Sequence, residues 1–159
     1  MSIFPTKVLL ATDGSKEAEL AARTAAELAD KTGSELHVVH VFGITPWYSA
    51  YPEGFGFGTA ELEDPVLEEE LQRTSERGAR EVLDAEVEKL RSLGVTQPQA
   101  HLVEGGVSQE IVGLAVGIGA GLIVLGSRGL GGIRRALMGS VSDSVVRHAH
   151  CPVMVVRED

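Results

Sequence analysis

Cysteine is nearly absent from this chain of 159 residues, in which Cys151 is the only one. One cysteine cannot form an intrachain disulfide, and the sequence has no CxxC motif and no spaced set of cysteines and histidines for a structural zinc ion. A small scaffold stabilised by disulfides or zinc is therefore excluded. The fold must be stabilised by packing, and we expect one domain over residues 1–159, with a composition that is 43% hydrophobic.

Long hydrophobic runs are also missing. A membrane-spanning helix needs roughly 18 or more consecutive apolar residues, and no stretch of this sequence approaches that length. The first residues, MSIFPTKVLL, lack a charged leader followed by a cleavable apolar stretch. We therefore expect no membrane span, no secretory signal and a cytoplasmic protein.

Positive charge is scarce, with 14 lysines and arginines against 23 acidic residues and a net charge of -9. An acidic surface repels the phosphate backbone of DNA and RNA, so we expect small ligands or proteins rather than nucleic acid as partners. The acidic excess is concentrated in residues 53–92, which we interpret as a solvated helix face. Residues 126–150 instead contain four arginines and one aspartate.

The spacing of hydrophobic residues alternates along the chain between the period of a strand and the period of a helix. Strand-like segments are found at 7–12, 35–41, 99–103, 122–125 and 152–156. Helical spacing is found at 18–32, 65–94, 108–118 and 141–149. Parallel strands joined by right-handed helical crossovers form a sheet with helices on both faces. We therefore predict an α/β three-layer sandwich with five parallel strands.

Residues 43–64 form a polar and aromatic segment with neither period. It contains five of the seven aromatic residues, Trp47, Tyr48, Tyr51, Phe55 and Phe57. We interpret it as a flexible insertion loop. Packing of these rings onto the domain is favoured over contact with a partner or ligand, and both remain open.

A glycine-rich segment follows the fourth predicted strand, where ligands of open parallel sheets bind. It reads GSRGLGGIRRALMGS over residues 126–140, with the pattern G-x2-G-x9-G-S. Glycine at 126 lets a ligand approach the backbone, Gly129 can take a positive φ, and Gly139 precedes a helix whose first N–H groups have no intrahelical partner. Such N–H groups bind phosphate oxygens.

Polar side chains near this helix start complete a phosphate-binding set. The Ser140 and Ser142 hydroxyls can donate hydrogen bonds, and Arg128 can balance the remaining negative charge, so a triphosphate fits. The alternative is a plain connection between a strand and a helix, although such connections usually have only about 2–6 residues. A Walker A loop and a complete GxGxxG motif are both absent.

Asp13 ends the first predicted strand and faces the same edge of the sheet. Its carboxylate can accept hydrogen bonds from ribose hydroxyls or hold a divalent cation, and the alternative is a turn or helix-capping role within Thr-Asp-Gly-Ser. Val41 ends the second strand and can pack against a flat base or belong to the core. His37 and His40 point to opposite strand faces and His101 stands alone, so no acid–base partner is evident for any of them.

The segments VLLATDGS, G-x2-G-x9-G-S and SVVRHAHCPVMVV, with the strand leading to Val41, resemble the universal stress protein family over nearly the whole chain. The resemblance implies strand order 3-2-1-4-5 and, because the glycines are present, the ATP-binding branch. It implies adenine and ribose contacts from Ala11, Thr12, Asp13 and Val41. It implies phosphate contacts from Gly126, Arg128, Gly129, Gly139, Ser140, Val141 and Ser142. Gly121 departs from the family, many of whose members have an aspartate just before the fourth strand.

The resemblance also implies a homodimer that pairs antiparallel through residues 152–156. We expect an ATP-binding stress-response module that uses ATP with Mg²⁺ or Mn²⁺, the cation held by Asp13, as a nucleotide-dependent switch read by protein partners. The alternative is a slow ATP-hydrolysing or phosphoryl-transfer enzyme in which Asp13 positions metal and water and Ser140 accepts phosphate. No residue set for that catalysis is complete in the sequence, so we assign no catalytic residue.

Overall fold

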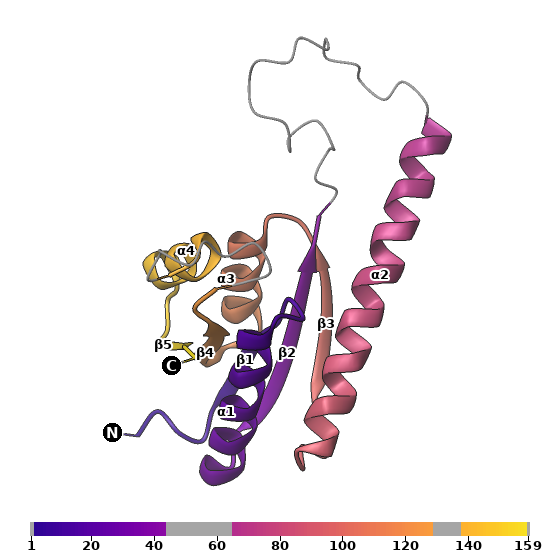
Figure 1. Cartoon of the computed structure of the whole chain (residues 1–159). Coiled ribbons are helices and arrows are strands. Elements are labelled where there is room, and N and C mark those ends of the chain that lie inside the picture. The colour runs from indigo at the N-terminus through magenta and orange to yellow at the C-terminus, as the bar shows by residue number, and fades with distance from the viewer. Residues whose placement is uncertain (1, 44–64, 129–137, 159) are drawn as a thin grey trace.

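The computed structural model describes residues 2–43, 65–128 and 138–158, and these residues form a parallel sheet with helices on both faces (Figure 1). The strands are β1 (Lys7–Ala11), β2 (Glu35–Phe42), β3 (Gln99–Glu104), β4 (Ala120–Gly126) and β5 (Val153–Val156). The helices are α1 (Lys16–Thr32), α2 (Pro65–Ser92), α3 (Val107–Ile118) and α4 (Ser140–His148). The sheet order is β3-β2-β1-β4-β5. The predicted fold class and strand order are confirmed.

The sheet separates the hydrophobic core into two clusters because successive side chains of a strand point to opposite faces. In β1, Val8 and Leu10 belong to the cluster under α1 and α2. Leu9 and Ala11 belong to the cluster under α3 and α4. Strand β1 is thus buried on both faces, as is expected for a central parallel strand.

Helix α1 joins the sheet through small side chains. Six alanines, Ala18, Ala21, Ala22, Ala25, Ala26 and Ala29, are buried along one face of the helix. Ser15 caps the amino end by accepting a hydrogen bond from the Ala18 amide, and Gly33 ends the helix with a φ of 64°. Because alanine adds little bulk, the amino end of α1 lies close to the strands.

Gly121 lies within β4, although the sequence suggested a position just before the strand. The register between β1 and β4 shifts here, because Lys7 pairs with Ala120 while Val8 pairs with Leu122. A Cβ on Gly121 would overlap the Thr6 hydroxyl. The glycine therefore permits this irregularity and the close approach of the chain before β1, which is a packing role.

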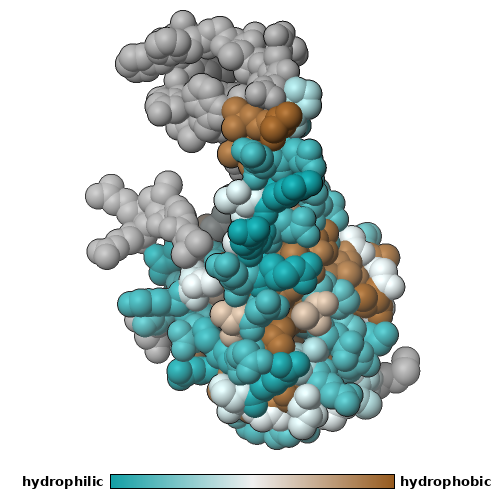
Figure 2. Space-filling model, turned by 90° about the vertical axis from the view of Figure 1, so that its right-hand side faces the viewer, coloured by the Kyte–Doolittle hydropathy of each residue, from teal (hydrophilic) through white to brown (hydrophobic). Residues whose placement is uncertain are grey.

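Helix α2 packs on the sheet through its carboxyl-terminal half only. Ala79, Leu83, Val87 and Leu90 are buried there. The amino-terminal turns extend beyond the sheet and expose Val66, Leu67 and Leu71, in a view that is otherwise largely hydrophilic along the helix (Figure 2). Glutamates such as Glu69 and Glu88 are exposed, which fits the solvated-face interpretation. Glu86 is different, since it is only 3% exposed.

None of the helices in the described ranges has both the length and the apolar character that crossing a lipid bilayer would require.

Candidate functional site

The candidate site lies where β1 and β4, adjacent strands of the sheet, reach their carboxyl ends. The chain leaves β1 toward α1 on one face and leaves β4 toward α4 on the other face. The amino end of each helix follows its strand, so the positive ends of two helix dipoles lie at this edge of the sheet. Open α/β sheets bind ligands at such a reversal of winding.

The turn after β1 is fixed by hydrogen bonds from three sides. The Thr12 amide donates to the Val39 carbonyl at 3.0 Å, and the Thr12 carbonyl accepts from Nδ1 of His40 at 2.8 Å. The Thr12 hydroxyl lies 3.4 Å from Oε2 of Glu86. Strand β2 and helix α2 therefore hold this turn and the position of the residue that follows it.

Asp13 follows directly and is partly exposed. Its Oδ1 accepts a hydrogen bond from the Ser15 amide at 2.9 Å. This is the turn role that the sequence offered as the alternative to a ligand role, while the helix cap itself is Ser15. The same geometry fixes the carboxylate at the carboxyl edge of the sheet.

Glu86 is a buried carboxyl group beneath this turn. Its Oε2 lies 3.9 Å from the Lys89 ammonium, whereas its Oε1 has no hydrogen-bond partner among the described residues. Burial raises the pKa of Glu86, and the negative charges of Glu19 and Asp13 act in the same direction, against the opposing effects of Lys89 and Thr12. The environment beneath Thr12 and Asp13 therefore disfavours the charged form of Glu86 more than water does.

Gly126 permits close packing between strand β4 and helix α1. A Cβ placed on Gly126 would lie 2.9 Å from the Glu17 Cβ and 3.0 Å from the Glu17 carbonyl carbon. The sequence interpretation gave this glycine the role of admitting a ligand to the backbone. The structure shows a packing requirement at this position, and a larger side chain would affect the fold as well as any ligand.

Glu17 joins the amino end of α1 to the turn after β4. Its Oε2 accepts hydrogen bonds from the Ser127 hydroxyl and from the Arg128 amide, both at 2.6 Å. Its Oε1 lies 3.4 Å from Nε of Arg128, and the Glu17 side chain is 11% exposed. Arg128, a candidate phosphate ligand, is therefore engaged by a carboxylate of the chain itself.

The amino end of α4 supplies backbone N–H groups at the site. Gly139 precedes the helix, and no side chain among the described residues caps it. Ser140 is exposed and Val141 is partly exposed. The first N–H groups of such a helix have no intrahelical partner, so this end of α4 retains the anion-binding character expected from the sequence.

Ser142 points inward, in contrast to the expectation that its hydroxyl donates to a ligand. The side chain is 2% exposed, and the hydroxyl lies 2.8 Å from the Ser127 carbonyl and 3.0 Å from the Gly139 carbonyl. A Cβ on Gly139 would lie 3.2 Å from the same Ser127 carbonyl. These contacts close the strand-to-helix connection and engage the Ser142 hydroxyl with the backbone of the chain.

Ala11 and Val41 are buried, at 9% and 8% exposure, and pack in the cluster under α3 and α4. Their side chains are core residues, which was the alternative considered for Val41. Gly129 lies outside the described residues.

His101 does not stand alone, contrary to the sequence interpretation. Its Nε2 lies 2.9 Å from Nδ1 of His37, whose Nε2 lies 2.7 Å from Oε1 of Glu35. Because a carboxylate only accepts, Nε2 of His37 carries hydrogen and Nδ1 of His37 accepts from His101. Burial and the neighbouring His37 lower the pKa of His101. Within the described ranges, no group of three or more potential ligands is arranged for a metal ion.

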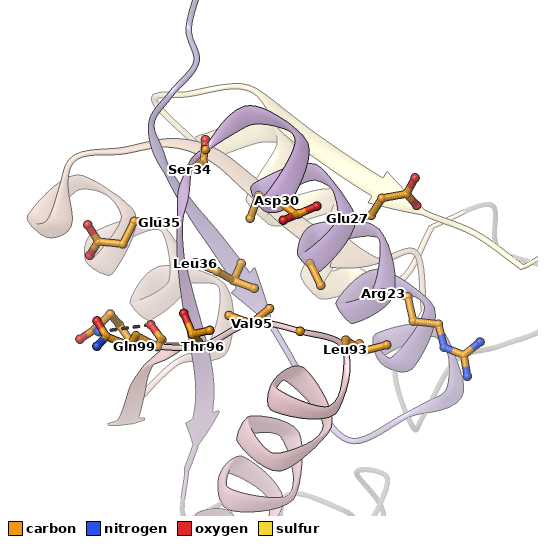
Figure 3. Close-up of a pocket in the computed structure, with 15 residues that line it drawn as sticks. Arg23, Glu27, Asp30, Ser34, Glu35, Leu36, Leu93, Val95, Thr96 and Gln99 are labelled. Atoms are coloured by element: carbon orange, nitrogen blue, oxygen red, sulfur yellow. Dashed lines mark hydrogen bonds between the residues drawn. The ribbon is translucent and has the colours of Figure 1, made fainter.

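A groove lies at the opposite edge of the sheet, where β2 and β3 begin (Figure 3). Glu27, Asp30 and Glu35 line it, together with the end of α1 and the connection from α2 to β3. Arg23 also lines the groove, but the three carboxylates outnumber it and the negative end of the α1 dipole lies here, so the groove is a poor site for phosphate. The chemistry expected from the glycine-rich motif belongs to the other edge.

Comparison with known proteins settles the family. The model of the universal stress protein family matches residues 5–157. The chain belongs to the universal stress protein family. A universal stress protein of Thermus aquaticus is 37% identical over 150 residues, which cover 94% of this chain and 97% of the relative.

Solved structures of universal stress proteins share the fold. The protein UspA from Lactobacillus plantarum has a TM-score of 0.77 at 25% identity, covering 97% of this chain and 99% of the other. A universal stress protein from Archaeoglobus fulgidus, solved in complex with dAMP, has a TM-score of 0.61 at 29% identity. That match covers 98% of this chain and 99% of the other.

Three residues of this universal stress protein that sequence reasoning missed surround the candidate site: Glu17, His40 and Glu86. Each contacts a predicted site residue or its turn from a distant part of the chain. Glu17 and Glu86 are thus two further carboxylates in the region of Asp13. A glutamate in the first turn of a helix is common, and nothing in the sequence separated these glutamates from their solvated neighbours.

Proposed function

We propose that this universal stress protein is an adenine-nucleotide-binding module of the ATP-binding branch, in which ATP with Mg²⁺ or Mn²⁺ sets a state that protein partners recognise. One observation carries the proposal. Ser127 links the amino end of α1, through Glu17, to the amino end of α4, through Gly139. Two helix amino ends are thus held beside the turn that bears Asp13, and such ends favour phosphate.

The residues present fit this ligand. The backbone of Gly139, Ser140 and Val141 would face the phosphates, and Asp13 would hold the ribose or the cation, which would offset phosphate charge. The complex of the Archaeoglobus fulgidus relative with dAMP supports the adenine-nucleotide class. Hydroxyl, amide and carboxylate groups here are ground-state ligands, which is what a binding module requires.

The decisive experiment is calorimetric titration of the purified protein with ATP in the presence of Mg²⁺. Ser140→Asp adds a negative charge at the start of α4, where the helix dipole favours it, so the fold should keep its stability while ATP affinity falls about tenfold or more. Gln109→Asp adds the same charge in the first turn of α3, outside the site, and is the matched control. Equal affinities for both variants would contradict the proposal.

The second candidate is a slow ATP-hydrolysing or phosphoryl-transfer enzyme that uses Asp13 and Ser140. The exposure of Ser140 at the amino end of α4 is the observation that favours it. If the protein is the binding module proposed above, we expect it to hydrolyse ATP more slowly than about 0.01 per second, well below typical enzymes. Steady turnover near ~1 per second that Asp13→Asn abolishes without changing ATP affinity would favour the enzyme.

We also propose that two copies of the chain pair antiparallel through β5. This strand ends the sheet order, and its four residues are only partly buried within one chain. An edge strand of this kind presents unpaired backbone groups, and pairing with a second copy satisfies them. The protein partners that would read the nucleotide state are not defined by this proposal.

A further inference from the structure

The Glu17 carboxylate contacts groups of Arg128 that would bind a nucleotide under the proposed function. Its Oε2 accepts from the Arg128 amide at 2.6 Å, and its Oε1 lies 3.4 Å from the Arg128 guanidinium. The amide and the guanidinium of one arginine are a strong combination for binding phosphate oxygens. In this structure the Glu17 carboxylate contacts both the amide and the guanidinium of Arg128.

Three features of the fold hold the Glu17 carboxylate at Arg128. The Ser127 hydroxyl, on a residue that is fully buried, donates to the same carboxylate oxygen at 2.6 Å. Glu17 stands in the first turn of α1, where the helix dipole stabilises negative charge, and its side chain is mostly withdrawn from water. Gly126 provides the close approach of β4 that makes this geometry possible.

We propose that Glu17 is a specificity-determining residue that competes with the phosphate chain of the nucleotide for Arg128. The inference rests on the proposed function. A nucleotide with one phosphate can bind the amino end of α4 while Glu17 keeps Arg128. A triphosphate brings further negative charge next to the Glu17 carboxylate, and it gains Arg128 only when Glu17 releases it.

Two states of the site follow from this competition. With a monophosphate bound, Glu17 still joins α1 to the turn after β4. With ATP bound, Arg128 turns to the phosphates and the link between α1 and that turn loosens. The nucleotide state would thus be expressed as the presence or absence of one contact between two elements, which is a difference that a partner can recognise.

The test compares ATP and AMP binding by calorimetry in the full chain. Glu17→Gln removes the charge but keeps the size and one oxygen acceptor for the Ser127 hydroxyl. Glu19→Gln is the matched control, because it removes the same charge from the same helical turn while its carboxylate contacts Arg23 at 3.3 Å, away from Arg128. We expect Glu17→Gln to strengthen ATP binding about fivefold and AMP binding less than about twofold. Glu19→Gln should change neither by more than about twofold.

A double-mutant cycle with Arg128→Gln isolates the competition. In that background the gain from Glu17→Gln should fall below about twofold, since there is no guanidinium to release. Weaker ATP binding in Glu17→Gln, equal gains for ATP and AMP, or an equal gain in Glu19→Gln would overturn the competition while leaving the proposed function standing. Folded variants that all fail to bind either nucleotide would overturn the proposed function and this inference together.

Discussion

His37 and His101 form a hydrogen-bonded pair across β2 and β3, with Nδ1 of His37 2.9 Å from Nε2 of His101. The two imidazole rings are nearly parallel, with an interplanar angle of 14°. Glu35 fixes the tautomer of His37 from the other side. Protonation of His101 therefore adds a positive charge to a partly buried ring that lies against His37.

The stability of the protein should fall as pH is lowered through the titration of His101. Burial and His37 lower the pKa of His101 in the folded state, so below about pH 6.5 the unfolded chain binds more protons. The loss should be less than about 1 kcal/mol, because the ring is partly exposed. Urea unfolding between pH 5 and 8 measures it. His101→Gln should make the free energy of unfolding depend less on pH, whereas replacing the exposed His150 by Gln should not. An equal pH dependence in the two variants would contradict the prediction.

Glu86→Gln should stabilise the protein at neutral pH. The pKa of Glu86 is raised by burial, so its contribution to stability is fully present below its unfolded pKa and is lost as pH rises through the folded value. Glutamine removes the buried charge and retains an acceptor for Thr12, with a gain on the order of 1 kcal/mol at pH 7 and little change near pH 4. Glu88→Gln, on the exposed face of α2, is the control. If Glu86→Gln instead destabilises the protein at pH 7, the ion pair between Glu86 and Lys89 contributes more to stability than burial of the carboxylate costs.

Gly126→Ala and Gly113→Ala should change stability in opposite directions. The new methyl group at 126 would meet the backbone of Glu17, which costs about 1–3 kcal/mol. At 113, within α3, a Cβ meets nothing within 4 Å, and alanine should stabilise the helix by roughly 0.5–1 kcal/mol. Thermal unfolding of the two variants provides the comparison. A Gly126→Ala protein as stable as the original would contradict the packing role.

Proline substitutions in β5 should separate folding from dimerisation. The Ile123 amide donates to the Pro152 carbonyl and the Ser127 amide donates to the Val156 carbonyl. Alternation along a parallel ladder then directs the Met154 amide toward β4 and the Val155 amide toward the free edge. Met154→Pro should therefore unfold the protein, and Val155→Pro should give a folded monomer.

Analytical ultracentrifugation at micromolar concentration distinguishes these outcomes. A folded Val155→Pro protein that sediments as the original dimer would place the interface elsewhere. A monomeric original protein would remove the dimer proposal altogether.

The sequence predicted the fold because each strand and helix carries its own period. The alternation in Val8, Leu9 and Leu10 is local information, and so is the alanine spacing in α1. Glycines at the ends of strands also pointed to the carboxyl edge of the sheet, where helices α1 and α4 begin. The packing role of Gly126 was not predicted, because the sequence does not distinguish a glycine that admits a ligand from one that admits a helix.

The contacts that the sequence did not predict, at the candidate site and elsewhere in the sheet, are long-range. Glu17 reaches Ser127 across 110 positions, Glu86 reaches Thr12 across 74, and His37 reaches His101 across 64. None of these residues departs from its neighbours in type or spacing. Only the three-dimensional arrangement distinguishes the buried Glu86 from the exposed Glu88 on the same helix.

The division of the hydrophobic core by the sheet has a consequence for cooperativity. The two clusters share no side chain, yet β1 and β4 contribute alternate residues to both: Leu10 and Val124 to one, Leu9 and Ile123 to the other. Loosening of either layer therefore displaces the same two strands and removes support from the other layer, so the two should melt in one transition. The candidate site is formed at the carboxyl ends of these two strands, and a ligand bound there would raise the melting temperature of both layers together.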